Sequence, residues 1–467
     1  MNHCIFISYF VELNLLLLLL SILPFITKNK SMSSSSAPVV GNDVQELTPW
    51  EAPDVVDYDK LLREFGCEAI SEELILRCEK LTGKPAHRFL RRGVFFSHRD
   101  LSRVLDLYER GQPFYLYTGR GPSSQSMHTG HLVPFLFTKW LQETFNVPLV
   151  IQITDDEKFY FKEYLTIDEI DVLAHENIRD IIALGFDMEK TFIFRDFHYI
   201  GHLYRTVARI EKATTANQVR GCFGFKGEDN VGKWMFPAIQ AAPAFSVCFP
   251  HIFPPVQPKE EDLKKAEEEA KKKKVKKGAA PVVETPKGPI HRNVYCLIPQ
   301  AIDQDPYFRL TRDIAPRLGF LKPALIHSKF FPGLAGSGGK MSSSVAAANT
   351  TAIFLTDTEK QIKDKINKHA FSGGGATKEE QLELGAFAPV DVPVQWLSFF
   401  LEDDVALADI QQEYSLGRIM TGQVKKQLIE ILKDIVIGHQ KARENVTDAN
   451  IAQFCAVRDM SRPEWSQ

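Results

Sequence analysis

Short apolar runs that alternate with stretches of helical length constrain the fold of this chain most strongly. Runs rich in aromatic and aliphatic residues occupy residues 114–118, 147–154, 191–194 and 294–299. Helix-like sequence follows, most clearly over residues 128–145. Strands that alternate with helices favour right-handed βαβ crossovers and a parallel sheet covered by helices. The sequence therefore predicts an α/β fold with a Rossmann-like parallel sheet.

Four regions are expected along the chain. They are an N-terminal extension, apolar then flexible, over 1–57, a helical region with a short strand over 58–112, a Rossmann-like domain over 113–349 with a lysine-rich insertion at 255–291, and an all-helical domain over 350–467. In the second region, residues 95–100 are typical of a strand that ends at a helix cap. In the last region, residues 410–437 and 450–457 have amphipathic helical patterns.

The composition is that of an ordinary globular protein, with 44% hydrophobic and 25% charged residues in a chain of 467. A formal net charge of -3 gives no bulk positive field, so a nucleic-acid partner would require a local basic surface. The seven cysteines are scattered and are never spaced as C-x-x-C. This pattern favours reduced thiols over a disulfide framework or a zinc site.

The amino terminus carries an apolar stretch over residues 4–26 with an unbroken leucine run at 15–20. Such a stretch is typical of a signal-peptide core or a signal anchor. However, no Lys or Arg precedes the leucines, and Met32, followed by four serines, resembles an alternative start. Because nothing downstream is typical of a secreted protein, we expect residues 1–31 to be an upstream extension.

Two short motifs predict the chemistry. Residues 128–131 (His-Thr-Gly-His) stand where a helix is expected to start, and two imidazoles three residues apart can donate hydrogen bonds to phosphate oxygens. Gly130 lets an adenine ring lie on the backbone because no Cβ stands in the way. Lys340 follows a glycine-rich stretch, so its charge can move onto a leaving pyrophosphate. Together the motifs resemble the signatures of class I aminoacyl-tRNA synthetases.

An aminoacyl adenylate forms when a carboxylate, already ionised at neutral pH, attacks the α-phosphorus of ATP. No general base is required, so positioning and stabilisation of the phosphoryl transition state dominate. The side chains to look for are therefore hydrogen-bond donors and cations. The candidates for this catalytic role are His128, His131, Lys340, Lys158 and Arg120.

Several longer runs are similar to those of eukaryotic cytoplasmic tryptophanyl-tRNA synthetases. They are residues 119–124, 149–152 with 154–158, 236–243, 301–309 and 367–374, and they agree in order from about Trp50 to the carboxyl terminus. The resemblance implies ATP-dependent activation of L-tryptophan, transfer to tRNA(Trp), and anticodon binding by the helical domain. It also implies Mg²⁺ bound with ATP without a dedicated protein metal site, and a cytoplasmic homodimer with no stable membrane partner.

The same resemblance assigns residues to ligands. Tyr117 and Gln152 would face the indole, whose N–H is only a donor and needs a phenol oxygen or an amide carbonyl as acceptor. A pocket built around that bond rejects phenylalanine. The residues that would hold the ammonium and the carboxylate are Glu157, Gln240 and Gln304. The residues that would bind ATP are Ser123, Ser124, Gly130, His131, Ile298, Lys340, Met341 and Ser342.

The chain departs from the usual pattern of these synthetases at two places. Gln300 stands where the family usually has cysteine, and this would add a polar group at the edge of the pocket. Gln125 and Ser126 replace the more familiar Glu-Ala. The lysine-rich segment 259–277, with nine lysines and six acids, is expected to be a solvated helix or loop. The alternative is a polylysine arm that attracts tRNA by counterion release.

Two other functions compete with a tryptophan-specific synthetase. A tyrosyl-specific relative would need acceptors arranged around a phenol, and the sequence does not show the motifs of that family. A catalytically inactive paralogue, serving as a binding module, predicts loss of the ATP clamp. His128, His131 and Lys340 are all present, so we favour the active enzyme.

Overall fold

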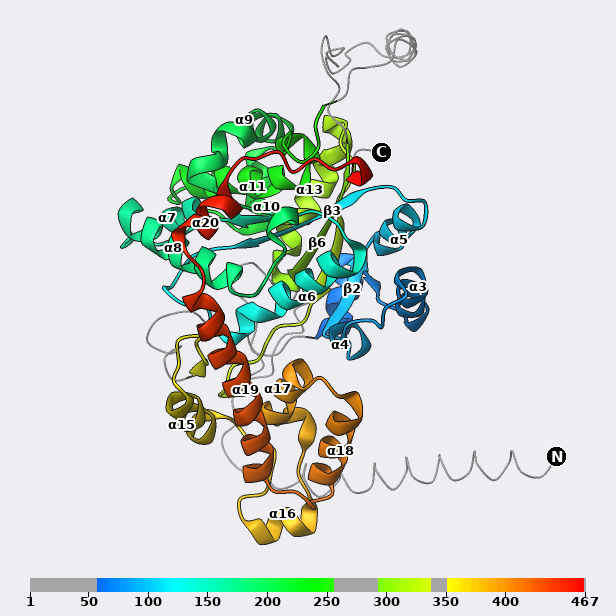
Figure 1. The fold of residues 1–467 in the computed structure, drawn as a ribbon, viewed down its shortest axis with the longest axis vertical. Coiled ribbons are helices and arrows are strands. Elements are labelled where there is room, and N and C mark those ends of the chain that lie inside the picture. The colour runs from blue at the N-terminus through cyan, green and yellow to red at the C-terminus, as the bar shows by residue number, and fades with distance from the viewer. Residues whose placement is uncertain (1–56, 256–292, 337–350, 466–467) are drawn as a thin grey trace, which may run out of the picture. The chain divides into compact units, whose positions relative to one another are not determined.

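A seven-stranded sheet organises the residues that the computed structural model describes, which are 57–255, 293–336 and 351–465 (Figure 1). The strand order is β1-β2-β7-β6-β3-β4-β5. The strands are β1 Glu68–Ala69, β2 Phe95–Arg99, β3 Phe114–Arg120, β4 Leu149–Ile153, β5 Thr191–Arg195, β6 Tyr295–Ala301 and β7 Ala324–Ser328. The five strands from β7 to β5 are parallel, whereas β2 runs antiparallel to β7 and β1 antiparallel to β2.

The four predicted strands are confirmed as β3, β4, β5 and β6, and the expected short strand is β2. The sequence did not indicate β7, which carries a polar His327 in a five-residue strand. The His327 ring lies 3.0 Å from the Ser97 hydroxyl and 3.1 Å from a carboxylate oxygen of Asp305, all of them buried. Because these partners come from β2 and from a helix, no local pattern marks the strand.

Helices cover both faces of the sheet (Figure 1). Those formed before residue 320 are α2 Tyr58–Phe65, α3 Glu72–Thr82, α4 Arg88–Arg91, α5 Leu101–Glu109, α6 Thr129–Phe145, α7 Asp155–Phe161, α8 Ile167–Ile182, α9 Asp196–Ala213, α10 Ala216–Phe223, α11 Val231–Ala241 and α13 Asp305–Leu318. Consecutive strand side chains point to opposite faces. Ile151 belongs to a buried cluster that includes residues of α5, α6 and α8, while its neighbour Val150 belongs to a second cluster that includes residues of α9, α11 and α13.

The described residues after 350 are helical, as predicted. The helices are α15 Glu359–His369, α16 Lys378–Leu384, α17 Val392–Phe400, α18 Asp404–Ser415, α19 Thr421–Glu444 and α20 Asp448–Cys455. The amphipathic run at 410–437 is two helices rather than one, because Gly417 adopts a φ of 70° between α18 and α19. The long α19 contacts α15 and α17 and also α8 (Figure 1), so it connects the helical region with the sheet region.

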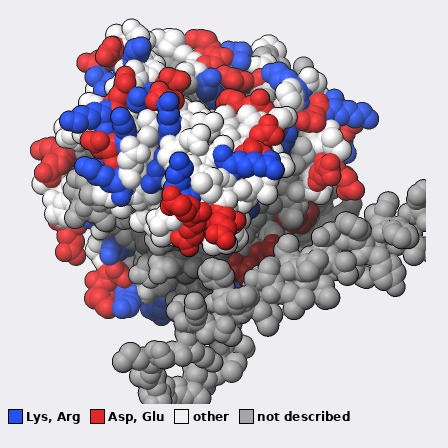
Figure 2. All heavy atoms as spheres, turned by 90° about the horizontal axis from the view of Figure 1, so that it is seen from below, with Lys and Arg blue, Asp and Glu red and all other residues white. Residues whose placement is uncertain are grey.

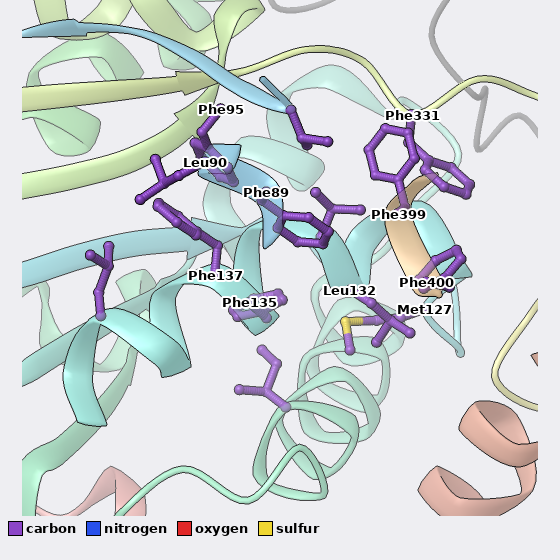
Figure 3. Close-up of a cluster of buried hydrophobic side chains, with 14 of the residues drawn as sticks. Phe89, Leu90, Phe95, Met127, Leu132, Phe135, Phe137, Phe331, Phe399 and Phe400 are labelled. Carbon is purple, nitrogen blue, oxygen red and sulfur yellow. The ribbon is translucent and has the colours of Figure 1, made fainter. Parts of the chain in front are cut away.

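Aromatic side chains join α6, β2 and α17 in one buried cluster (Figure 3). Phe95 and Phe137 stack with ring centroids 3.8 Å apart. The ring centroid of Phe331, which follows β7, lies 4.9 Å from that of Phe399 and 4.6 Å from that of Trp396, both on α17. Phe331 therefore packs the segment after β7 against the helical region.

Some predicted features lie outside the described residues. They are the apolar stretch at 4–26, the lysine-rich segment 259–277, and Lys340, Met341 and Ser342. Among the helices that are described, none is long and apolar enough to cross a membrane.

Candidate active site

A pocket of about 300 Å³ lies at the carboxyl ends of β3, β6 and β7 and beside the start of α6. Ligands of parallel α/β sheets bind at this edge. The pocket brings together most of the predicted site residues, namely Tyr117, Arg120, Ser123, His128, Gly130, His131, Glu157, Lys158, Gln240, Ile298 and Gln304. Gln152 and Ser124 are not part of its lining.

A buried hydrogen-bond chain supports one side of the pocket. The Tyr117 hydroxyl donates to Gln152 Oε1 and is also 2.9 Å from the backbone carbonyl of Gln240. The Gln240 side-chain amide donates to the same hydroxyl at 2.8 Å. Gln152 Nε2 donates to both carboxylate oxygens of Asp196, at 2.8 and 3.0 Å. Asp196 therefore fixes the amide so that its carbonyl faces Tyr117, and Gln152 acts on the pocket through Tyr117.

Three buried carboxyl groups, Asp155, Asp156 and Asp196, stand behind Gln152, with oxygens within 4.8 Å of one another. Arg195 donates to Asp155 at 2.8 Å. Burial, together with the charge of Asp156, raises the pKa of Asp196 well above its usual range, and burial also raises the pKa of Asp156. The Asp156 and Asp196 carboxyls therefore hold a proton between them near neutral pH.

Replacing Asp196 with asparagine should make stability less dependent on pH. The raised pKa means that folded Asp196 binds a proton more tightly than the unfolded chain, so its contribution to stability falls as pH rises above the ordinary value of 3.8. Asparagine keeps an acceptor for Gln152 but carries no charge. Urea unfolding followed by circular dichroism at pH 5 and pH 8 should show the variant gaining stability over wild type at pH 8. The same difference at both pH values would contradict the shared proton.

Arg120 and His131 meet where α6 begins. His131 Nδ1 lies 3.2 Å from the backbone nitrogen of His128, and His131 Nε2 lies 3.0 Å from Arg120 Nη1. Burial lowers the pKa of Arg120 to about 10, so the guanidinium remains charged and only donates. Its N–H therefore points at Nε2 of the His131 ring, which accepts it. The pair holds a positive charge in the pocket, and an anionic oxygen that enters beside it would accept from the guanidinium.

The two signature histidines are linked to the chain that follows the Lys340 segment. The rings of His128 and His131 stack with centroids 3.5 Å apart. Thr129 N–H donates to the carbonyl of Ile353 at 2.9 Å, and Leu355 N–H donates to the carbonyl of Met127 at 2.9 Å. The described residues after segment 337–350 are thus held beside the histidine motif.

Glu157 and Lys158 form an ion pair at 2.9 Å in the lining of the pocket, just after β4. The Thr154 hydroxyl donates to Glu157 at 2.7 Å. Gly121 leaves the room for both side chains, because a Cβ there would overlap Lys158 Cε and stand 2.9 Å from Glu157 Oε2. The loop after β3 therefore needs glycine to keep this pair in place.

Replacing Gly121 with alanine should lower the kcat/KM of amino-acid activation about tenfold while leaving the melting temperature nearly unchanged. The added methyl group displaces flexible side-chain ends rather than backbone. Gly221→Ala on α10 is the matched control, since a Cβ there meets nothing within 4 Å. Wild-type kinetics for the Gly121 variant would show that the position of the ion pair is unimportant.

The remaining predicted residues occupy the pocket rim or its support. Gln304 ends a short 3-10 turn before α13 and donates to Asp303 at 3.2 Å. The Ser124 hydroxyl bonds the carbonyl of Ser126, so it serves the loop. A Cβ on Gly130 would lie 3.1 Å from the Phe331 ring and 3.2 Å from the His128 ring. The absence of a side chain at Gly130 therefore admits these two rings.

Two buried polar residues of α8, Asn177 and Asp180, hold residues of the pocket or next to it in the chain and were not predicted from the sequence. Asn177 accepts from Arg120 Nε at 3.1 Å and donates to the carbonyl of Ser124 at 2.7 Å. Asp180 accepts from the backbone N–H of Met127 at 3.1 Å and from Arg443 of α19 at 2.6 Å. A signal existed, because Asn177 falls at a position of α8 where helical spacing favours an apolar residue.

Within the part of the chain that the structure describes, two groups of side chains have ligand atoms close enough to hold a metal ion, and both have protein partners. In the first, Arg195 and Gln152 bond the carboxylates of Asp155 and Asp196. In the second, Cys67 stands beside Asp305 and His327, and Arg99 donates to Asp305 at 3.0 Å. These contacts explain both groups as internal networks.

The pattern of one family matches the parts of the chain that build this pocket. Residues 109–242 and 297–436 match the family described as tRNA synthetases class I (W and Y). The chain belongs to this family. These matched segments include β3, the histidine motif, the carboxyl end of β6 and the first two thirds of the long α19.

Individual relatives of this family cover most of the chain. A protein of Dictyostelium discoideum named tryptophan–tRNA ligase, cytoplasmic, is 51% identical over 421 residues, which are 89% of this chain and 96% of the relative. The human protein of the same name is 52% identical over 409 residues, 87% of this chain and 79% of its own. The crystal structure of Plasmodium falciparum tryptophanyl-tRNA synthetase has a TM-score of 0.74 and 45% identity, covering 88% and 97% of the two chains.

Proposed function

We propose that this chain is a tryptophan–tRNA ligase, which activates L-tryptophan with ATP to tryptophanyl adenylate and transfers it to tRNA(Trp). The observation that carries the proposal is one pocket with two kinds of lining. On one side lies Tyr117, whose hydrogen-bond chain through Gln152 offers acceptors to an indole N–H. The other lining is formed by the Arg120 guanidinium, which is hydrogen-bonded to His131. The names of the relatives support the same activity.

The amino-acid side of the pocket selects by hydrogen bonding. Burial raises the pKa of Tyr117 well above its usual range, so the phenol keeps its proton. Its oxygen has a lone pair for the indole N–H while its own proton goes to Gln152. Glu157 provides a carboxylate for the α-ammonium group. Gln240 and Gln304 border the space where the α-carboxylate would lie.

The nucleotide side acts by positioning and by charge. The carboxylate of tryptophan attacks the α-phosphorus and pyrophosphate leaves, so negative charge develops on phosphate oxygens. Arg120, held in place by its hydrogen bond to His131, donates to that charge, and Lys158 adds a second cation in the same pocket. We assign ATP binding further to Ser123, Ile298 and Gly130, which line the pocket, whereas Ser124 supports the loop that carries Ser123. Mg²⁺ enters with the phosphates of ATP and needs no protein ligand of its own.

Lys340, Met341 and Ser342 complete the proposal, although they lie outside the described residues. The chain that precedes and the chain that follows segment 337–350 meet each other, since Leu334 N–H donates to the carbonyl of Thr351 at 3.1 Å. Leu334 and Thr351 are therefore neighbours, and they lie close to the histidine motif because Thr129 bonds Ile353. From there Lys340 can bring its charge to the departing pyrophosphate.

Pyrophosphate exchange with the full chain tests the proposal. Exchange into ATP should depend on L-tryptophan and should be at least about 100-fold weaker with L-tyrosine or L-phenylalanine. Exchange that depends on tyrosine would identify a tyrosyl-specific enzyme instead. Tryptophan binding without any exchange would identify a binding module. Charging of tRNA(Trp), measured in the same preparation, tests the second step.

We propose that tRNA contacts are local and that the helical region binds the anticodon. On the face shown in Figure 2, basic and acidic side chains are interspersed, which matches the net charge of -3. Such a surface does not attract RNA by a bulk field. The contact of α19 with both α17 and α8 gives the helical region a direct connection to the sheet region. A cytoplasmic location agrees with the names of the relatives.

We propose further that the chain forms a homodimer through α7, α9 and α11. These helices contact one another, and they carry exposed apolar residues that a monomer would leave in water, namely Phe159, Tyr204, Val231 and Met235. Val231→Glu should shift sedimentation equilibrium from dimer to monomer. Val405→Glu on α18 is the matched control, because both valines are 70% exposed. A monomeric wild-type chain, or equal effects of both variants, would contradict this interface.

A further inference from the structure

Gln300 is a buried carboxamide that faces the pocket. It is the sixth residue of β6 (Tyr295–Ala301) and its side chain is only 5% exposed. It lines the pocket together with Ile298, which is two residues earlier and therefore on the same face of the strand. Among the described residues, neither Gln300 Oε1 nor Gln300 Nε2 has a hydrogen-bond partner.

Such a side chain is costly to the free protein. A buried amide has lost its water, and without protein hydrogen bonds nothing offsets that loss. An apolar residue of similar size would avoid the cost. A ligand that supplies the missing hydrogen bonds would recover it, so the position of Gln300 in the pocket indicates a contact with substrate.

The neighbouring groups decide which part of the substrate needs this amide. The α-ammonium of an amino acid already has carboxylate neighbours in the pocket, Glu157 and Asp303. The α-carboxylate accepts only, so it needs N–H donors. The side-chain amides of Gln240 and Gln304 each already donate to a protein oxygen, Tyr117 and Asp303 respectively. Gln300 Nε2 has both of its protons available.

We propose that Gln300 Nε2 donates a hydrogen bond to the α-carboxylate of bound tryptophan. This assignment rests on the proposed function, because it takes tryptophan as the amino acid. Neither end of the carboxamide is held by the protein, so the group can turn its N–H toward the ligand without breaking an existing bond. The bond holds one carboxylate oxygen while the other attacks the α-phosphorus.

Binding of tryptophan and of tryptamine, which lacks the carboxylate, tests the assignment. Isothermal titration of the full chain gives both dissociation constants without ATP. Gln300→Met keeps the length of the side chain but removes the N–H. It should raise the dissociation constant of tryptophan about tenfold while leaving that of tryptamine within twofold of wild type. Gln300→Glu keeps the shape but adds a negative charge. This variant should bind tryptophan more weakly than the methionine variant does, and it should bind the cationic tryptamine at least as tightly as wild type.

The outcomes separate failure of this inference from failure of the proposed function. If wild type binds no tryptophan, the proposed function fails. If wild type binds tryptophan and both variants change tryptophan and tryptamine equally, Gln300 does not contact the carboxylate. A raised KM for ATP with unchanged tryptophan binding would place the amide on the nucleotide instead. Thermal unfolding of each variant controls for folding, and Gln300→Cys replaces the methionine variant if that one does not fold.

Discussion

Replacing His131 with alanine should lower the rate of adenylate formation about 100- to 1,000-fold. The His131 ring accepts from Arg120 Nη1 at 3.0 Å and so holds the guanidinium in one position in the pocket. A donor held in place needs no reorganisation when negative charge develops on a phosphate oxygen, and that charge is largest in the transition state. The loss should therefore appear in kcat, whereas tryptophan binding should stay within about twofold, because the indole lies against Tyr117.

Single-turnover pyrophosphate exchange at saturating ATP measures this effect. His198→Ala is the control, because His198 is an exposed residue of α9 outside the pocket. Arg120→Met should give a loss of similar size. The double variant should lose less than the product of the two single losses, since His131 acts through the guanidinium of Arg120. Fully independent losses would contradict this coupling, and a His131 variant with the wild-type rate would remove the histidine from the catalytic role.

The parts of the fold that the sequence predicted are those set by local patterns. Central strands such as β4 are buried on both faces, so they appear as continuous apolar runs. The sequence did not predict β7, because the ring nitrogens of its His327 form hydrogen bonds with Ser97 and Asp305, which are distant in sequence. The sequence pattern also did not show where α18 ends and α19 begins, because Gly417 ends one amphipathic pattern just before a similar one begins.

The site residues show the same contrast between local patterns and contacts with distant segments. The motifs predicted Arg120, His131 and Tyr117, and the pocket contains all of them. The residues that hold them come from distant segments and have no motif. Asn177 holds Arg120 from α8, and Asp196 orients Gln152 from the start of α9. A buried polar residue becomes interpretable only when its partner is known, and the partner is set by tertiary packing.

Replacing Gln152 with leucine should reduce the preference for tryptophan over phenylalanine by about 1–3 kcal/mol. Gln152 is fully buried and accepts the Tyr117 proton while it donates to Asp196. Leucine fills a similar volume but accepts nothing. The Tyr117 proton then has only the carbonyl of Gln240 as its acceptor, while the Gln240 amide still donates to the oxygen. The remaining lone pair of the Tyr117 oxygen therefore changes direction and no longer faces the indole N–H. Phenylalanine has no N–H and loses nothing by this change.

The comparison of kcat/KM for the two amino acids in pyrophosphate exchange measures the preference, and the KM for ATP should stay within about twofold of wild type. Gln142→Leu is the matched control. Gln142 is also a buried glutamine, with Nε2 2.9 Å from the Thr191 hydroxyl, but it is not part of the pocket lining. Both variants lose a buried hydrogen bond and should lose similar stability, so only Gln152→Leu should alter selectivity. An equal fall for tryptophan and phenylalanine would mean that Gln152 supports the fold rather than the acceptor for the indole.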